Sequence, residues 1–433
     1  MEHQEATLQK RIGFSVALSI VIGTIIGSGV FMKPGSVLAY SGGSTMAIAA
    51  WVIGGILTLA GGLTVAEVGA QIPKTGGLYV YLEEVYGEFW GYLSGWMQTI
   101  IYGPAIMGTL GLYFGSLLVN FFSLHTASIV PLGIGTVVFL GVVNIIGTKY
   151  GGAVQTITTV GKLAPIALII IFGLWKGEAQ VFNVLVPPAA GTSIGMAILA
   201  TLFAYDGWIL LASISGEMKN PAKLLPKAIF VGLLVVTFSY VFINIALMKV
   251  LPAGDIVRLG ENATATAATL LFGAIGGKLI SIGIIISIFG CLNGKIMTFP
   301  RIPFAMAERG QLPFATTFSR VHPKFHTPAN AIYMQLALAT IMMLLANPDR
   351  LSEISVFIIY LFYVMAFFAV FLLRKKNKTR VYSVPLYPFM PILAIIGSVF
   401  VIISTLLNQP MTCILSLVGV LSGLPVYVYL KRI

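Results

Sequence analysis

Residues 21–31 read VIGTIIGSGVF and lie within an apolar segment long enough to cross a lipid bilayer. The stretch contains three glycines and two hydroxyl residues. Each glycine destabilises a helix by about 1 kcal/mol relative to alanine, and non-helical backbone persists at membrane depth only where it is buried or lines a cavity. We therefore predict a helix that is broken near residues 25–27 and restarts at Ser28. The alternative is a continuous helix in which Gly23 and Gly27 form a helix-packing pair.

A break at this position would leave backbone polar groups free in the middle of the membrane. The amides of Gly27, Ser28 and Gly29 would point from a helix N-terminus, which attracts carboxylates. The free carbonyls of the preceding half-helix would attract cations. Together these groups would hold both ends of a zwitterion, an arrangement typical of secondary transporters.

The composition excludes an ordinary soluble domain. The 433 residues are 58% hydrophobic and 9% charged, with a mean hydropathy of +0.96, whereas soluble domains average about 25% charged residues. We therefore predict a polytopic, all-α membrane protein. Because no signal-peptide cleavage site follows the first apolar span, we expect this span itself to direct insertion into the membrane. The two cysteines, Cys291 and Cys413, lie in apolar segments and indicate neither a disulfide framework nor a zinc site.

Twelve apolar segments are long enough to span the membrane. They have about 20 residues or more and lie near 12–38, 45–70, 88–119, 130–148, 151–175, 192–216, 227–251, 275–300, 328–347, 351–373, 387–407 and 411–430. With a cytoplasmic N-terminus, most Lys and Arg residues fall on the cytoplasmic side. The basic residues on the opposite side are Lys33, Lys176, Lys249, Arg258, Lys278 and Arg350. This bias predicts that both termini are cytoplasmic, and it explains the net charge of +12 and the basic run at 374–380 without a nucleic-acid partner.

A second interrupted span lies at residues 200–208, which read ATLFAYDGW. It shares a small-Thr-apolar-apolar-small pattern with residues 23–27, and the two patterns fall in spans six and one. Because a unit of five spans is odd-numbered, a second copy enters the membrane from the opposite face, which predicts two inverted repeats. The predicted divisions are a cytoplasmic tail at 1–11, repeats at 12–175 and 192–373, and a basic loop with two further spans at 374–433.

Lys162 is the one Lys or Arg residue that we place deep in a span. It lies about 15 Å from the start of the fifth span, where an unpaired cation costs about 2.5–3.5 kcal/mol. Our hypothesis is that its ammonium group replaces a bound sodium ion, which makes transport independent of sodium. The alternative is a structural lysine that snorkels or donates hydrogen bonds to carbonyls to stiffen the bundle.

Three other polar or aromatic residues are candidates. Asp206 follows the second break, and we expect it to cap the restarting half-helix; a partner for the substrate ammonium or a proton carrier is the rival role. Phe203 is either a gate over the substrate or ordinary packing. Tyr240 carries a hydroxyl that needs a hydrogen-bond partner in lipid, and a neighbouring helix would provide one.

Enzymatic chemistry finds little support in the sequence. The four histidines, His3, His125, His322 and His326, lie in the tail or in loops, and no cluster with metal-ligand spacing occurs at membrane depth. The Gly-Lys pairs lack the flanking residues of a phosphate-binding loop. We therefore expect no cofactor or bound metal, and energy from gradients or exchange.

Several motifs resemble the L-amino acid transporter family of the amino acid–polyamine–organocation superfamily, and within it the bacterial serine/threonine exchangers. The resemblance covers nearly the whole chain. The motifs are GTIIGSG at 23–29, PKTGGLY at 73–79, LFAYDGW at 202–208, GCLNG at 290–294 and AER at 307–309. The resemblance implies a five-plus-five inverted-repeat fold, with helices 1 and 6 broken, and alternating access by rocking of a bundle.

The resemblance also implies a substrate site at the two breaks. The amides of residues 27–29 would take the substrate carboxylate, and carbonyls near Ile22, Gly23 and Phe203 would take the ammonium. The residues with an implied substrate-binding role are Ile22, Gly23, Thr24, Gly27, Ser28, Gly29, Phe203, Ala204 and Tyr240.

By the same resemblance, Phe203 is the gating aromatic residue, Lys162 the fifth-span lysine in the sodium position and Tyr240 the seventh-span tyrosine. The outer loop at 120–130 lacks the cysteine that joins animal family members to a glycoprotein heavy chain, so we expect no disulfide-linked partner.

The sequence thus predicts a sodium-independent exchanger of small neutral L-amino acids, chiefly serine and threonine, in a bacterial plasma membrane. Two alternatives stay open. The first is a proton-coupled symporter, which needs a titrating group such as Lys162 or Asp206. The second is a membrane sensor that binds amino acids without moving them.

Overall fold

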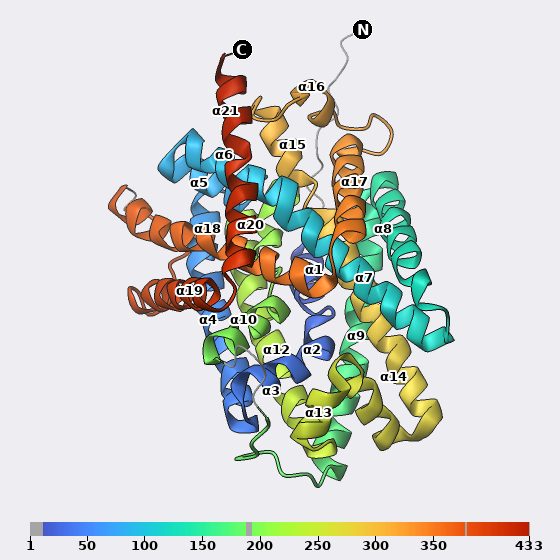
Figure 1. The fold of residues 1–433 in the computed structure, drawn as a ribbon. Helices are drawn as coiled ribbons and strands as arrows, with labels where there is room; N and C mark the ends of the chain where they lie inside the picture. Colours follow the sequence, from blue (N-terminus) through green and yellow to red (C-terminus); the bar gives the residue numbers. More distant parts are fainter. Residues whose placement is uncertain (1–11, 188–192, 377–378, 433) are drawn as a thin grey trace.

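The computed structural model describes residues 12–187, 193–376 and 379–432, and these residues form a bundle of helices (Figure 1). Within these described residues, ten helical segments are long and apolar enough to cross a membrane, and two shorter apolar helices, Ile194–Ala204 and Ala329–Leu345, correspond to the sixth and ninth predicted spans. The prediction of twelve apolar spans is confirmed. The predicted tail at 1–11 lies outside the described residues.

The first span is broken where the glycines predicted it. Helix α1 (Phe14–Ile25) ends at Ile26, whose ψ of 97° is extended, and α2 (Gly29–Met32) begins after Ser28. The glycines also permit close packing. A Cβ atom on Gly27 would lie 2.6 Å from the sulfur of Cys291, and one on Gly23 would lie 1.8 Å from the Gln155 amide nitrogen. The break is therefore confirmed and the continuous helix is wrong, although Gly23 and Gly27 also permit close packing.

The sixth span is broken as well. Helix α10 (Ile194–Ala204) is capped by the Ser193 hydroxyl, which accepts a hydrogen bond from the Gly195 amide. The chain then turns through residues 205–209, and Gly207 adopts a φ of 122°, which favours glycine. Helix α11 (Leu210–Ser213) continues the span.

The remaining elements complete the bundle around these two broken helices. Their bounds are α3 (Pro34–Ser41), α4 (Ser44–Gln71), α5 (Leu78–Tyr86), α6 (Glu88–Met97), a π-helical turn (Gln98–Tyr102), α7 (Gly103–Phe122), α8 (Ile129–Ile146), α9 (Thr148–Lys176), α12 (Pro221–Val250), α13 (Ala253–Leu259), α14 (Ala263–Thr298), α15 (Arg301–Glu308), α16 (Ala315–Phe318), α17 (Ala329–Leu345), α18 (Pro348–Lys376), α19 (Phe389–Asn408), α20 (Pro410–Leu421) and α21 (Gly423–Arg432). Helix α14 begins well before the predicted residue 275 and contains a kink at Gly273.

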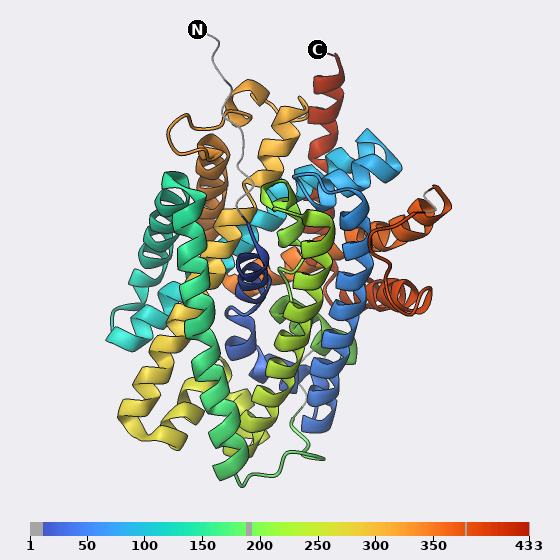
Figure 2. The ribbon, with the colours of Figure 1, turned by 180° about the vertical axis from the view of Figure 1, so that it is seen from behind.

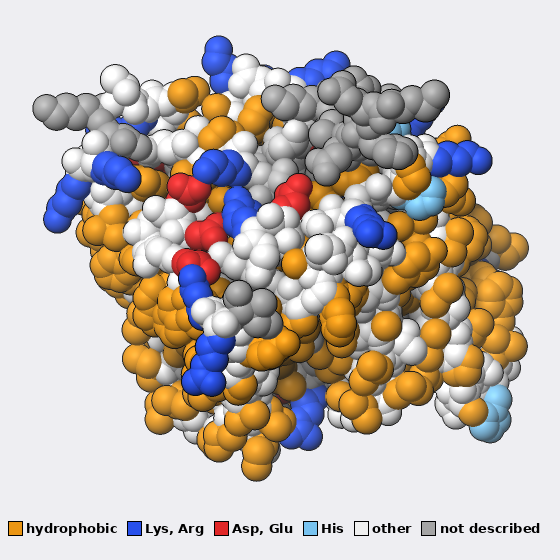
Figure 3. Space-filling model, turned by 90° about the horizontal axis from the view of Figure 1, so that it is seen from above, with side chains coloured by type: hydrophobic (Ala, Val, Ile, Leu, Met, Phe, Trp, Pro, Cys, Tyr) orange, Lys and Arg blue, Asp and Glu red, His pale blue; other side chains and the backbone are white. Residues whose placement is uncertain are grey.

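Helix α1 lies at the centre of the bundle and packs against α9, α12 and α14 (Figure 2). Helices α15 and α21 lie at one end of the molecule, whereas α3 and α13 lie at the other (Figure 1). Viewed onto the first end, Lys, Arg, Asp and Glu side chains gather on the surface, and hydrophobic side chains surround them (Figure 3). This pattern is that of a protein whose sides face lipid and whose end faces water.

A buried ion pair fixes the loop between α18 and α19 to the bundle. The Glu67 side chain of α4 is 0% exposed and accepts hydrogen bonds from Arg374 Nε (2.8 Å) and Nη2 (2.6 Å). The Val384 amide donates a third bond to the same carboxylate (2.6 Å), and the Arg374 guanidinium lies 3.7 Å from the Tyr387 ring centroid. The carboxylate therefore holds the end of α18 and the following loop against α4.

We predict that Arg374→Ala lowers the melting temperature of the purified protein strongly. The substitution leaves the Glu67 carboxylate buried without its counter-charge, which costs about 3–5 kcal/mol. Thermal unfolding in detergent measures the effect. Lys375→Ala, which removes an exposed neighbouring charge, is the control; equal melting temperatures for the two variants would contradict the prediction.

Candidate functional site

The break in the first span exposes backbone amides at the centre of the bundle. No hydrogen bond joins the amides of Gly27, Ser28 or Gly29 to another described residue. The Ser28 hydroxyl is also buried and has no partner within the described ranges. Buried polar groups are nearly always satisfied, so this cluster of donors is suited to a bound anionic group.

Lys162 contacts the same break from α9. Its ammonium is fully buried and donates hydrogen bonds to the Gly23 carbonyl (2.9 Å) and the Ile26 carbonyl (2.5 Å). In a continuous helix these carbonyls would accept bonds from the amides four residues later. The lysine therefore satisfies acceptors that the break has freed. Both roles considered for Lys162, as a replacement for sodium and as a structural hydrogen-bond donor, require this contact.

Tyr240 of α12 connects the two breaks. Its buried hydroxyl lies 3.1 Å from the Ile25 carbonyl and 3.0 Å from the Ala204 carbonyl. One hydroxyl carries one proton, so it can donate to only one of these carbonyls at a time. The two half-helices therefore share a single donor on a third helix.

The predicted cap by Asp206 is wrong. Helix α11 begins at Leu210, after Ile209, with no side-chain cap. The Asp206 carboxylate accepts hydrogen bonds instead from Tyr102 Oη (2.5 Å) and Lys295 Nζ (2.6 Å). It is only 8% exposed, and a carboxylate so deeply buried requires a counter-charge more than a short helix requires a cap.

The statement that Lys162 is the one deep basic residue is also wrong. Lys295 of α14 is 2% exposed and pairs with Asp206 beside the second break. Arg301, which begins α15 at the end of the molecule, is also buried and pairs with Glu217 at 3.0 Å. The sequence-based distribution of Lys and Arg places Lys295 on the cytoplasmic side, whereas the structure places it beside the cavity between the two breaks. The signal that could have identified Lys295 was the unpaired Asp206, since an acid in an apolar span requires a basic partner in another span.

A small cavity of about 20 Å³ lies between the two breaks. Its volume corresponds to roughly one water molecule, so the site is nearly closed. The residues that line it are Thr24, Ile25, Gly27, Ser28, Gly29, Ile106, Leu110, Phe203, Asp206, Cys291 and Lys295. Of the predicted substrate residues, Ile22, Gly23, Ala204 and Tyr240 do not line it. The Ile22 carbonyl already accepts the Ile26 amide (2.8 Å), as the Gly23 carbonyl accepts Lys162.

Phe203 lies between this cavity and a second one toward α3. The second cavity has about 120 Å³ and is lined by Phe203 together with Lys33 and Asp349. Lys33 Nζ pairs with Asp349 (2.8 Å) and lies 5.3 Å from the Phe203 ring centroid. The Tyr113 hydroxyl also donates to Asp349 (2.9 Å). An aromatic ring and an ion pair thus close the inner cavity on this side.

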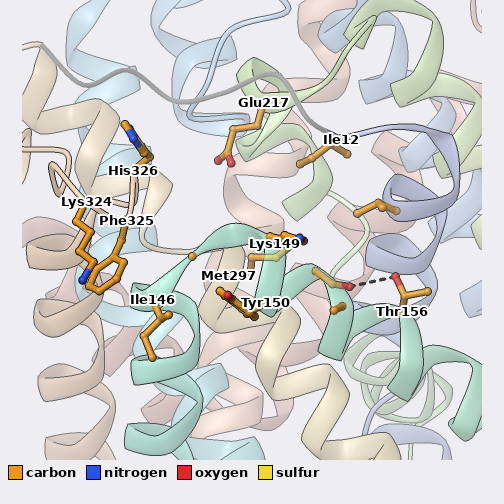
Figure 4. A pocket seen from close by; sticks show the side chains of 14 residues that line it. Ile12, Ile146, Lys149, Tyr150, Thr156, Glu217, Met297, Lys324, Phe325 and His326 are labelled. Carbon is orange, nitrogen blue, oxygen red and sulfur yellow. Dashed lines mark hydrogen bonds between the residues drawn. The ribbon is translucent and has the colours of Figure 1, made fainter. Parts of the chain in front are cut away.

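A larger cavity of about 760 Å³ lies on the opposite side, between the start of α1, the start of α9 and the loop before α17 (Figure 4). Ile12 and Glu217 lie at one side of it and Lys324 and His326 at the other (Figure 4). The structure is therefore closed toward α3 and more open toward the end that carries α15 and α21.

A model of amino acid permeases matches residues 12–418. The chain belongs to the amino acid permease family. It is 66% identical to the serine/threonine exchanger SteT of Bacillus subtilis (strain 168), over 100% of this chain and 99% of that protein. It is 32% identical to the mouse large neutral amino acids transporter small subunit 2, over 97% of this chain and 81% of that protein. It is 30% identical to the human Asc-type amino acid transporter 1, over 98% of this chain and 83% of that protein. The family resemblance of the motifs is confirmed, and the chain is a multi-pass membrane protein.

We predict that Gly29→Ala destabilises the permease. A Cβ atom there would lie 2.4 Å from the Ala204 Cα atom and 3.2 Å from its nitrogen, so the backbones of the two broken helices would have to separate. Overpacking of this kind costs about 1–3 kcal/mol, which thermal unfolding in detergent measures. Gly135→Ala, where a Cβ atom meets nothing within 4 Å, is the control. A Gly29→Ala variant as stable as this control would contradict the close approach.

Proposed function

We propose that this chain is a sodium-independent exchanger of small neutral L-amino acids, chiefly serine and threonine, that works by alternating access in the plasma membrane. The observation that carries the proposal is the fully buried Lys162 ammonium on the Gly23 and Ile26 carbonyls, because a fixed positive charge there takes the place of a sodium ion. The names of the relatives support a neutral amino acid as substrate, since one describes an exchanger of serine and threonine and another a transporter of large neutral amino acids.

In our proposal the substrate carboxylate binds the free amides of residues 27–29 and the Ser28 hydroxyl. The ammonium binds carbonyls at the ends of α1 and α10. Several of these carbonyls already accept one bond; the Thr24 carbonyl accepts the Cys291 thiol (3.1 Å) and the Phe203 carbonyl accepts the Asp206 amide (3.2 Å). Each carbonyl oxygen has a second lone pair, which the ammonium would use.

The charges around the cavity favour a neutral side chain on the substrate. Asp206 is paired with Lys295 at 2.6 Å, so the cavity offers no uncompensated carboxylate to a cationic side chain. Ile106, Leu110 and Cys291 form an apolar part of its lining, in a space that is already small. These features favour small substrates such as serine and threonine.

Two further features are part of the proposal. We infer that both termini are cytoplasmic, which the distribution of Lys and Arg supports. The cavity of about 760 Å³ would then open inward, as expected for one state of an alternating-access cycle. We also infer that no heavy chain is attached by a disulfide, which the burial of both Cys291 and Cys413 supports.

Uptake of radiolabelled L-serine into proteoliposomes tests the proposed function. We expect uptake that requires internal L-serine and is the same with and without sodium. Uptake into vesicles without internal amino acid, driven by a pH gradient, would favour a proton-coupled symporter instead. Binding without uptake under any condition would identify a sensor.

We predict that Lys162→Ala reduces the rate of serine exchange by about 10- to 100-fold, because two buried carbonyls lose a charged donor. Lys176→Ala, at the exposed end of the same helix, should leave the rate unchanged. Initial rates in vesicles with equal amounts of folded protein provide the comparison. An unchanged rate in Lys162→Ala would refute the assigned role of this lysine.

A further inference from the structure

A groove of about 430 Å³ lies between the start of α12 and the loop that joins α18 to α19. It is distinct from the cavities at the two helix breaks. Lys223, Lys227 and Phe230 of α12 form one side, together with Leu63 of α4. The other side is formed by four loop residues, Val381, Tyr382, Ser383 and Pro385. The groove therefore combines basic and apolar surfaces.

The exposed face of α12 changes from basic to apolar along the helix. Lys223, Lys227 and Phe230 are all exposed and recur at the spacing of one helix face. Farther along α12, Phe238 (61% exposed) and Phe242 (43%) are also exposed, as expected for a surface that contacts lipid tails. Lys223 and Phe230 are separated by about 10 Å along the helix axis. The basic surface followed by an apolar surface along α12 matches an amphipathic ligand with a charged head and an apolar tail.

The polar groups at the basic end of the groove lack protein partners. Neither Lys223 nor Lys227 forms an ion pair within the part of the chain that the structure describes, although Lys227 Nζ lies 4.8 Å from the Phe14 ring centroid. On the loop side of the groove, the Tyr382 hydroxyl is buried without a hydrogen-bond partner among the described residues.

The loop side of the groove is held in place by the buried pair of Glu67 and Arg374. Because Glu67 also accepts the Val384 amide (2.6 Å), residues next to Val381 and Tyr382 are fixed against α4. The positive charge of Arg374 is neutralised by Glu67, whereas no acidic side chain among the described residues pairs with Lys223 or Lys227. The groove is thus a formed site with unmatched positive charge.

We propose that this groove binds one anionic phospholipid from the leaflet at the end that carries α15 and α21. The head-group phosphate contacts Lys223 and Lys227, and an acyl chain lies along Leu63 and Phe230. Basic pockets at the edge of the membrane attract anionic head groups. A zwitterionic lipid fits less well, because its own cation would face the two lysines. The proposal does not depend on which amino acid the protein transports.

Native mass spectrometry of the purified full-length protein tests the proposal. The protein is titrated with phosphatidylglycerol or with phosphatidylcholine of the same acyl chains, and retained lipid is counted. We expect a preference for phosphatidylglycerol of at least about fivefold, the effect of one lysine near an anionic surface. The variant Lys223→Gln/Lys227→Gln should lose this preference.

A matched variant separates a specific site from general attraction. Lys375→Gln/Lys376→Gln removes the same charge from exposed positions outside the groove, and it should keep the preference. An equal loss in both double variants, or no preference in the unmodified protein, would overturn the proposal. If Lys223→Gln/Lys227→Gln is too unstable to purify, Lys223→Gln alone provides the same comparison, with a smaller loss of the preference for phosphatidylglycerol.

A second control separates a lipid from a free phosphate. Glycerol 3-phosphate at matched ionic strength should neither displace phosphatidylglycerol nor raise the melting temperature, because it lacks the chain that lies along Phe230. Displacement at concentrations similar to those of the lipid would mean that the groove recognises phosphate alone, which would also overturn the proposal.

Discussion

The architecture of the site depends on one constraint, which is that backbone carbonyls freed by a helix break must find donors where water is scarce. Lys162 meets this constraint at the first break by donating to the Gly23 and Ile26 carbonyls. Tyr240 adds one further donor, since its hydroxyl lies within hydrogen-bond distance of the Ile25 and Ala204 carbonyls and can donate to either one at a time. With donors from α9 and α12 directed at the freed carbonyls, the amides of residues 27–29 can stay free on the cavity side. The asymmetry between satisfied acceptors and free donors is what makes the cavity suited to a carboxylate.

A second set of interactions controls charge and access. The pair of Asp206 and Lys295 joins α14 to the turn of the sixth span, and Tyr102 connects it to a π-helical turn in the third. A local π-helical turn often marks a functional site. On the side of α3, Lys33 and Asp349 close the space above Phe203. Contacts on this side would have to open for a substrate to pass, whereas the opposite side already has a cavity of about 760 Å³.

Much of this architecture could be predicted from composition and local pattern. Glycine and hydroxyl residues at 23–29 predicted the first break, and Asp206 with Gly207 marked the second, because both stretches violate what a lipid-exposed helix tolerates. The partner of Asp206 could not be predicted in the same way. Lys295 lies 89 residues away, and no local pattern indicates which spans meet. The cap proposed for Asp206 failed for this reason, since a tertiary ion pair outweighed a local preference. The two inverted repeats and the roles of the site residues stay predictions.

The most direct test of the account is amide hydrogen exchange across residues 24–29 in the unmodified protein and in Lys162→Met, read by mass spectrometry of the peptide that contains them. If the lysine holds the break in its observed shape, the variant should exchange these amides markedly faster, and added L-serine should slow their exchange in the unmodified protein but not in the variant. Identical exchange in the two proteins, with the same protection by serine, would show that the broken helix keeps its shape without Lys162 and would contradict the central claim.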